Sequence, residues 1–136
     1  MSSHGFEVIE LSKMTLGEQA SAFASATQIV APHGAGLANL VFCGRGAAVC
    51  ELQMNEYMPW FFRRLAGTRD LTYGCLIGQA EPSGGAGMWA HTKRWSAPVD
   101  RLRAVLDDPC FSDATRASVA ELPFAGGSIA ALFNRP

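Results

Sequence analysis

The sequence predicts an α/β fold in which helices flank a parallel sheet within a single domain. Short apolar, strand-like segments alternate with helical segments over about the first 77 residues. This alternation is typical of parallel sheets joined by right-handed crossovers. The chain has 136 residues, of which 49% are hydrophobic and 17% charged, so one domain can bury a sizeable core. We find no internal repeat.

Local patterns predict the first three elements. Residues 6–11 alternate apolar and polar side chains, which indicates a strand. Thr15 and Glu18 have the spacing of a capping box, so a helix is expected to begin there and to include the alanine-rich residues 19–26. The short apolar run at residues 28–31 predicts a buried strand.

Four further elements complete the predicted core. Residues 37–42 favour a helix, which the glycines at 44 and 46 interrupt. Residues 47–52 predict a third strand and residues 71–77 a fourth. Between these two strands, residues 57–66 predict a helix with aromatic side chains on its buried side.

The rest of the chain predicts a loop and a helical segment. Residues 78–87 are rich in Gly, Pro and Ser. A helix is expected between Pro98 and Pro109, with an apolar stripe made of Val99, Leu102, Val105 and Leu106. A weaker helix follows residue 112. The domain, residues 1–136, therefore divides into a core at about 5–77, a loop at 78–90 and a C-terminal helical segment at 96–122.

The charge balance excludes several classes of partner. Eleven basic and 12 acidic side chains give a net charge of −1, and the charges are dispersed, which argues against strong binding to nucleic acid or to an anionic membrane. The apolar runs end well before the roughly 18 residues that a membrane span needs, and no signal peptide is apparent. We expect a soluble, cytoplasmic domain without a membrane span.

The cysteines and carboxylates do not predict a metal site. Cys43, Cys50, Cys75 and Cys110 are widely spaced and contain no CxxC pair, so we expect buried, reduced thiols rather than zinc ligands or a disulfide framework. No cluster of Asp and Glu has the spacing of a cation site. The sequence therefore predicts no bound metal.

The most informative stretch is a strand, a glycine-containing turn and a helix at residues 29–40. Its centre reads Pro-His-Gly-Ala-Gly at residues 32–36. Ligands of open α/β sheets bind beyond the carboxyl ends of the strands, and glycines allow unusual dihedral angles and a close approach of the backbone. Free N–H groups at the start of the following helix suit a phosphate, to which His33 could also donate. Taken alone, the pattern equally fits a tight turn that a histidine braces.

Residues 5–73 resemble the C-terminal part of the catalytic domain of glycosyltransferase family 61. The matching pieces, in chain order, are residues 5–9, 16–19, 23–26, 29–42 and 48–52. The most specific is the run His33-Gly34-Ala35-Gly36-Leu37 with Asn39 and Phe42 behind it. One departure is Ala38, where the family more often has Thr or Ser.

This resemblance implies a Rossmann-like, donor-binding half of a GT-B glycosyltransferase. Such enzymes transfer a sugar from a nucleotide-sugar donor to a glycan or protein acceptor, with inversion and without an essential metal or other cofactor. The acceptor half would then lie outside these residues, and the chain alone is expected to bind donor but not to transfer the sugar. A non-catalytic nucleotide-sugar-binding or structural α/β module is the alternative.

The resemblance also assigns site residues. It implies that His33 is catalytic and that the residues next to it lie near the donor diphosphate; these are Gly34, Ala35, Gly36 and Leu37. Glu51, which the sequence places at the end of a strand, is a candidate ligand of the ribose hydroxyls, with a surface carboxylate as the alternative. Asn39 either stabilises the turn, which we favour, or contacts the ligand. No residue is assigned as the base that deprotonates the acceptor.

Three other features have simpler interpretations. An esterase would need Gly-x-Ser-x-Gly with a later histidine, and residues 126–130 lack both the final glycine and that histidine. The aromatic residues 60–62 beside Arg63 and Arg64 favour core packing with a solvated edge over stacking on nucleic acid. Trp89 and Trp95 flank basic residues and are weaker candidates for contact with a sugar or phosphate.

Overall fold

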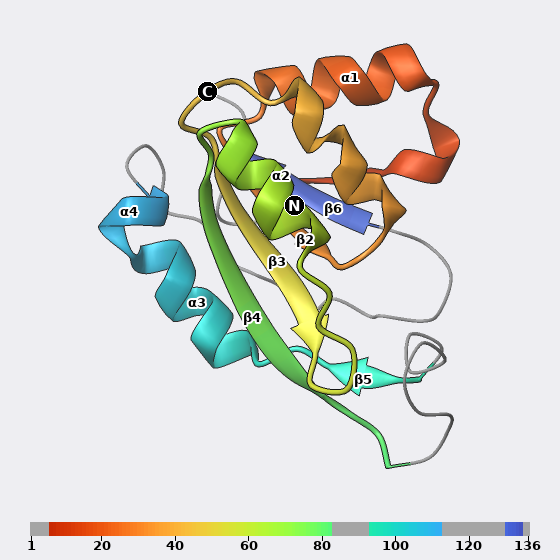
Figure 1. The fold of residues 1–136 in the computed structure, drawn as a ribbon, viewed down its shortest axis with the longest axis vertical. Coiled ribbons are helices and arrows are strands. Elements are labelled where there is room, and N and C mark those ends of the chain that lie inside the picture. Colours follow the sequence, from red (N-terminus) through yellow and green to blue (C-terminus); the bar gives the residue numbers. More distant parts are fainter. Residues whose placement is uncertain (1–5, 83–92, 113–129, 135–136) are drawn as a thin grey trace.

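A computed structural model describes residues 6–82, 93–112 and 130–134 of the chain. These residues form an α/β fold in which helices flank a mixed, mostly parallel sheet (Figure 1). The sheet has six strands in the order β1-β6-β2-β3-β4-β5. The predicted fold class is therefore confirmed, although the sheet is not purely parallel.

The strands are β1 (Phe6–Glu10), β2 (Gln28–Pro32), β3 (Ala48–Met54), β4 (Thr72–Ala80), β5 (Trp95–Ser96) and β6 (Ala130–Asn134). The α-helices are α1 (Leu16–Ser25), α2 (Phe61–Thr68), α3 (Val99–Asp107) and α4 (Pro109–Ser112). Two 3₁₀ helices, η1 (Leu11–Lys13) and η2 (Ala35–Phe42), precede α1 and follow β2.

Two strands that the sequence did not predict make the sheet mixed. Strand β6 lies between β1 and β2 and runs antiparallel to both. Strand β5 is antiparallel to the end of β4, with Gln79 opposite Ser96 and Ala80 opposite Trp95. Strands β2, β3 and β4 are parallel neighbours. Strand β1 runs in the same direction as they do, because β1 and β2 are both antiparallel to β6.

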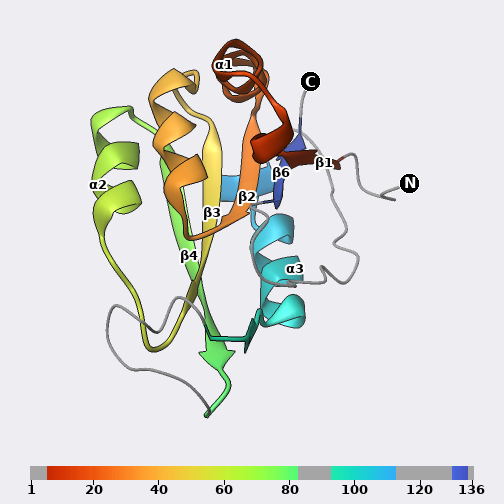
Figure 2. The same ribbon diagram turned by 90° about the vertical axis from the view of Figure 1, so that its right-hand side faces the viewer.

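The topology places the first helical elements on one face of the sheet. Strands β1 to β4 follow each other across the sheet in chain order, so right-handed crossovers put all the intervening helices on the same side. Figure 2 shows α1, η2 and α2 on one side of the sheet and α3 on the other. The two faces therefore have separate cores.

The two cores draw on alternate residues of the same strands. The core beneath α1, η2 and α2 includes Ile29, Ala31, Val49, Phe23 and Leu37. The core beneath α3 includes Val30, Cys50, Leu52, Leu102 and Leu106. Since all seven residues of β3 are buried, this central strand is covered on both faces.

Several local predictions are confirmed. Thr15 caps α1, its side chain accepts a hydrogen bond from the Glu18 N–H, and the Glu18 carboxylate accepts one from the Thr15 N–H. Because of these bonds, the pKa of Glu18 lies below its usual value. Helix α3 begins after Pro98 and ends before Pro109, and it buries Leu102 and Leu106 as the stripe predicted.

The predicted helix at 57–66 is wrong in its start and in its buried side. Tyr57 forms an isolated bridge with Met54, and α2 begins only at Phe61. Pro59 disfavours a helical conformation of the preceding residue, which accounts for the later start. The side chains of Trp60 and Phe61 are 65% and 64% exposed, so Phe62 is the one aromatic residue of this run that packs against the core.

Other boundaries also differ from the predictions. The helix expected at 37–42 is the 3₁₀ helix η2, which begins two residues earlier. Strand β4 continues to Ala80, into the expected loop at 78–90, and residues 83–92 lie outside the described parts of the chain. The predicted weak helix after residue 112 and the glycines at 126 and 127 also lie outside them. None of the helices described here has the length and apolar composition of a membrane span.

Candidate functional site

His33 lies directly after β2, at the carboxyl end of the parallel strands. Its backbone N–H donates to the Leu52 carbonyl at 2.7 Å, which continues the pairing of β2 with β3 by one residue. Ala31 is opposite Glu51 in this register. Because side chains alternate along strands, His33 and Glu51 lie on the same face of the sheet, beneath η2 and α2.

Glu51 occupies the middle of β3 and is fully buried. The prediction that it ends its strand is therefore wrong, and so is the alternative of a surface carboxylate. Strand β3 continues past it to Met54, where Gln53 is buried with its side-chain amide donating to the Pro59 carbonyl at 2.9 Å. Backbone pairing with β2 and β4 on both sides encloses Glu51.

Both carboxylate oxygens of Glu51 have partners. One is hydrogen-bonded to Nδ1 of His33, and the other accepts a hydrogen bond from the Tyr73 hydroxyl on β4. Burial, followed by the hydrogen bond to Glu51, raises the pKa of Tyr73, so this phenol keeps its proton and remains a donor. Residues on or directly after three adjacent strands thus form one polar cluster around the buried Glu51, His33–Glu51–Tyr73.

Aromatic side chains surround the His33 ring. The Tyr57 ring lies edge-on to it at 5.6 Å between centroids, with Phe62 at 5.2 Å and Phe61 at 6.4 Å. The His33 side chain is 17% exposed. Nδ1 of the ring faces Glu51, which leaves Nε2 as the nitrogen through which the ring can meet a ligand.

The turn after His33 is more regular than its glycines predicted. Gly34 has extended backbone angles, with φ and ψ both 169°, and among the described glycines only Gly46, with φ 79°, lies in the left-handed region. The expectation of unusual dihedral angles is therefore wrong. Leu37 is the first residue of the turn to donate within η2, to the Gly34 carbonyl at 3.0 Å. The N–H groups of Gly34, Ala35 and Gly36 precede it at the positive end of the helix dipole.

Leu37 and Asn39 have structural contacts. The Leu37 side chain is fully buried in the core, so only its backbone lies at the turn. The Asn39 side chain donates to Oε1 of Gln19 at 2.8 Å, and Gln19 in turn donates to the carbonyls of Leu11 and Met14. Asn39 thereby ties η2 to α1, and its favoured role in stabilising the turn stays a prediction. A further contact of Asn39 with a ligand stays a prediction.

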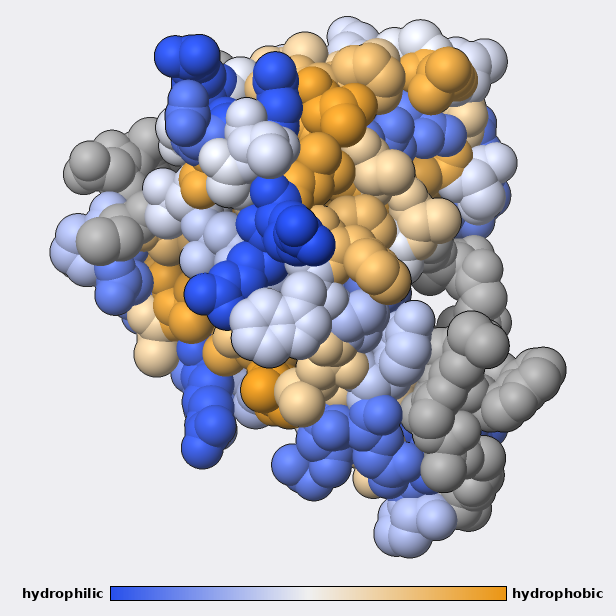
Figure 3. All heavy atoms as spheres, in the orientation of Figure 1, coloured by the Kyte–Doolittle hydropathy of each residue, from blue (hydrophilic) through white to orange (hydrophobic). Residues whose placement is uncertain are grey.

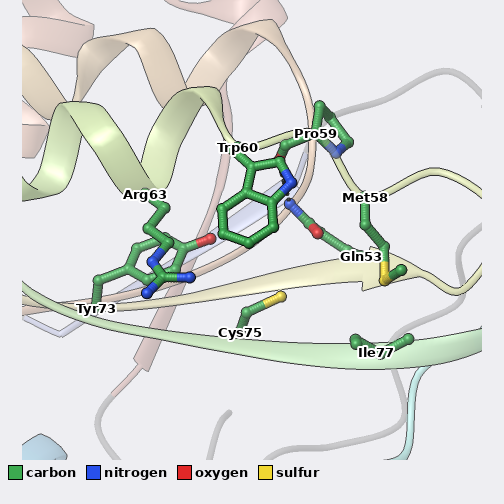
Figure 4. Close-up of a pocket in the computed structure, with 8 residues that line it drawn as sticks. All are labelled: Gln53, Met58, Pro59, Trp60, Arg63, Tyr73, Cys75 and Ile77. Atoms are coloured by element: carbon green, nitrogen blue, oxygen red, sulfur yellow. Dashed lines mark hydrogen bonds between the residues drawn. The ribbon is translucent and has the colours of Figure 1, made fainter.

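Two cavities adjoin this cluster. A small one of about 70 Å³ is lined by His33, Pro32, Leu52, Met54, Tyr57 and Trp95, and Trp89 lies outside the described residues. A larger cleft of about 470 Å³ opens beside it and is lined by Gln53, Met58, Pro59, Trp60, Arg63, Tyr73, Cys75 and Ile77 (Figure 4). Tyr73 belongs both to this cleft and to the polar cluster.

Sequence reasoning missed Tyr73 and Gln53. A usable signal existed, because Glu51 and Gln53 on one strand and Tyr73 on the next are polar residues at alternate positions of otherwise apolar strands. Polar residues at such positions need partners when they are buried. The signal did not identify the partners, because that requires the register between strands.

The described residues contain no group of three or more His, Cys, Asp or Glu side chains that could hold a metal ion. Cys43 and Cys50 are buried free thiols, and burial raises their pKa values to about 11 and about 12. Cys75 is also free but exposed, contrary to the prediction that all the thiols are buried. The side chain of Cys110 is not among those described.

Comparison with known proteins gives one match. Searches of curated proteins and of solved structures find nothing that matches the chain. The family model described as "Glycosyltransferase 61" matches residues 1–50, which include α1, β2, the turn after His33 and η2. Over these residues the chain is therefore similar to glycosyltransferase family 61.

Proposed function

We propose that this chain contributes the donor-binding part of a family 61 glycosyltransferase domain, with the nucleotide-sugar diphosphate at residues 33–36. The match to the family over residues 1–50 supports this proposal, because it includes this turn. The location supports it independently. Residues 33–36 join the carboxyl end of β2 to the start of η2, and such positions in α/β proteins commonly bind phosphate.

The observation that carries the proposal is the buried His33–Glu51–Tyr73 cluster. A fully buried carboxylate is costly, and replacing such a group by apolar residues is often neutral or stabilising. A chemical role for His33 would explain why Glu51 is present despite the free-energy cost of burying its carboxylate. Glu51 fixes the orientation of the imidazole, and Tyr73 fixes Glu51. We therefore propose that Glu51 holds His33, in place of the ribose contact that the sequence predicted.

The proposed chemistry concerns the leaving group. As the bond between the anomeric carbon and the phosphate oxygen breaks, negative charge develops on the nucleoside diphosphate. The N–H groups of Gly34, Ala35 and Gly36 would stabilise this charge, and a protonated His33 would donate to it through Nε2 while Nδ1 donates to Glu51. Fixed donors of this kind need no reorganisation during the reaction. Transfer would be inverting, and the acceptor would be bound by a further part of the enzyme.

The test is a calorimetric titration of the chain with UDP, GDP and CDP. We expect binding of at least one of them. His33→Gln should weaken it about 10- to 100-fold, the range for loss of a hydrogen bond to a charged group. Gln is chosen because its amide can still donate to Glu51. Arg103→Ala, at an exposed position of α3 on the opposite face, is the control and should bind as the parent does. A well-folded parent that binds none of the three would refute the proposal.

A further inference from the structure

The 470 Å³ cleft begins one strand away from His33. Pro32 is opposite Leu52, so His33 is level with Gln53, and Gln53 is opposite Ile77 on β4. These three residues therefore lie on the same face of the sheet, in adjacent strands spaced by roughly 4.8 Å. Gln53, Tyr73, Cys75 and Ile77 form the floor of the cleft, and the segment from Met58 to Arg63 forms its wall (Figure 4).

The wall and floor of the cleft are mostly apolar and remain open to solvent. The Trp60 side chain is 65% exposed, Ile77 46% and Met58 45%. Large apolar side chains that gather around one hollow commonly mark a binding site. The volume lies within the range of about 300–1,000 Å³ typical of small-molecule sites.

Few polar groups reach this cleft, and their charge is one-sided. Arg63 is the only ionisable cation among the eight lining residues, and none of the eight is acidic. Its guanidinium stacks on the Trp60 ring, 5.1 Å from the centroid, which holds the positive charge at the rim. The hydrogen bond to the Pro59 carbonyl holds the Gln53 amide in place. The amide oxygen and the second N–H of this group could then pair with a ligand ring whose edge carries both a donor and an acceptor.

This lining discriminates between two kinds of ring. A pyranose without a phosphate has no charge to offer the Arg63 guanidinium, and it presents hydroxyls around its whole circumference to the apolar side chains of Met58, Pro59 and Ile77. A nucleobase has two apolar faces and hydrogen-bonding groups at its edge only. The apolar walls, the single amide and the guanidinium therefore fit a base with an attached phosphate.

We propose that this cleft binds the nucleobase of a nucleoside phosphate. The base packs between Trp60 and the β4 side chains, its edge meets Gln53, and Arg63 attracts the phosphate charge. The inference rests on the proposed function, because it assigns to the cleft the base of the same nucleotide-sugar donor. It goes beyond that function by placing the recognition of the nucleotide on residues 53–77, outside the segment that matches the family.

The experiment compares UDP and GDP with inorganic pyrophosphate and free glucose, by calorimetry on the full chain. Trp60→Ala should weaken binding of the better nucleotide about 5- to 150-fold, the range for loss of one base stack. It should weaken the binding of pyrophosphate much less, because pyrophosphate has no base to stack and Arg63 keeps its charge without the Trp60 ring. Ile77→Glu, which places an anion in the cleft, should also weaken nucleotide binding. Leu16→Ala, at an exposed apolar position of α1, and Arg64→Ser, outside the cleft, are matched controls and should have no effect.

The outcomes separate this inference from the proposed function. Nucleotide binding that depends on His33 but not on Trp60 or Ile77 overturns the cleft assignment and leaves the proposed function standing. Binding that depends on Trp60 and Ile77 but not on His33 supports the cleft and overturns the turn as the diphosphate site. Glucose binding that exceeds nucleotide binding overturns the choice of a base, and the absence of all binding overturns both proposals.

Discussion

The two faces of the sheet differ in what they bury. Beneath α3 the core is apolar, with Leu52 of β3 packed near Leu102 and Leu106. Beneath η2 and α2 the same strand contributes the charged Glu51 and the polar Gln53. Apolar side chains in these positions would be cheaper to bury than a carboxylate. The α3 face is therefore explained by packing alone, whereas the other face carries residues that packing does not require.

The surface over α2 and η2, which lie on the same side of the sheet, is mixed in polarity. In the space-filling view, hydrophilic side chains over α2 lie beside apolar side chains over η2 (Figure 3). Val41 and Phe42 of η2 are 43% and 39% exposed.

The largest expected effect comes from breaking the buried cluster at its centre. Glu51→Ala leaves His33 and Tyr73 without their shared acceptor and should lower the free energy of unfolding by about 4 kcal/mol. The triple variant His33→Phe, Glu51→Leu, Tyr73→Phe replaces the cluster by apolar groups and should recover most of that loss while abolishing nucleotide binding. Urea unfolding measures the stability of the two variants, and calorimetric titration measures the loss of nucleotide binding. A loss below about 1 kcal/mol for Glu51→Ala would contradict the contrast between the faces.

A smaller loss is expected on the apolar face. Leu102 is fully buried beneath the sheet, and Leu102→Ala should cost about 3 kcal/mol in the free energy of unfolding, because it leaves a cavity. Nucleotide affinity under native conditions should not change, since α3 is on the face away from His33. Affinity that fell with stability would show that the faces are coupled.

The smallest effect is a pH dependence that the two faces should share. Cys43 belongs to the core beneath η2, Cys50 to the core beneath α3, and burial raises the pKa of each thiol, to about 11 and about 12. The unfolded chain ionises first, so this contribution to stability is complete below about pH 8.5 and declines as pH rises toward the folded-state values. Each thiol should account for a loss of about 1–2 kcal/mol by pH 10.

Cys43→Ala and Cys50→Ala should each reduce the slope of unfolding free energy against pH between about 8.5 and 11, by similar amounts. The comparison of slopes removes the contribution of other groups that titrate in the same range. A slope that changes for Cys50→Ala alone would indicate that water reaches the core beneath η2, and it would sharpen the contrast between the faces.

The elements that the sequence predicted well are those with local signals. The capping box at Thr15 and the prolines around α3 act within one turn of a helix, and four strands followed from their patterns. Strand β6 was missed because nothing local distinguishes a short apolar segment that pairs with strands 100 or more residues earlier. The late start of α2, by contrast, had a local signal that the sequence prediction did not use, because Pro59 disfavours a helical conformation of Met58.

The candidate site was predictable only in part. The turn at residues 33–36 was identified because a strand, glycines and a helix follow each other in the chain. Glu51 was identified as a candidate, but its place in the strand was wrong and its partners were unknown. Tyr73 was missed, because its bond to Glu51 depends on the alignment of β3 with β4. Contacts between strands are set by register, and no single strand carries that information.

The position of β6 has a consequence for the order in which the chain folds. Strand β1 is made before the other described strands, but its neighbour in the sheet is β6, which is made after all of them. During synthesis β2, β3 and β4 can pair as soon as they emerge, while β1 waits for about 120 more residues. Until β6 arrives, the outer side of β2 remains an open strand edge, which is a risk for aggregation. Burial of Phe6 and Ile9 is then among the last events of folding.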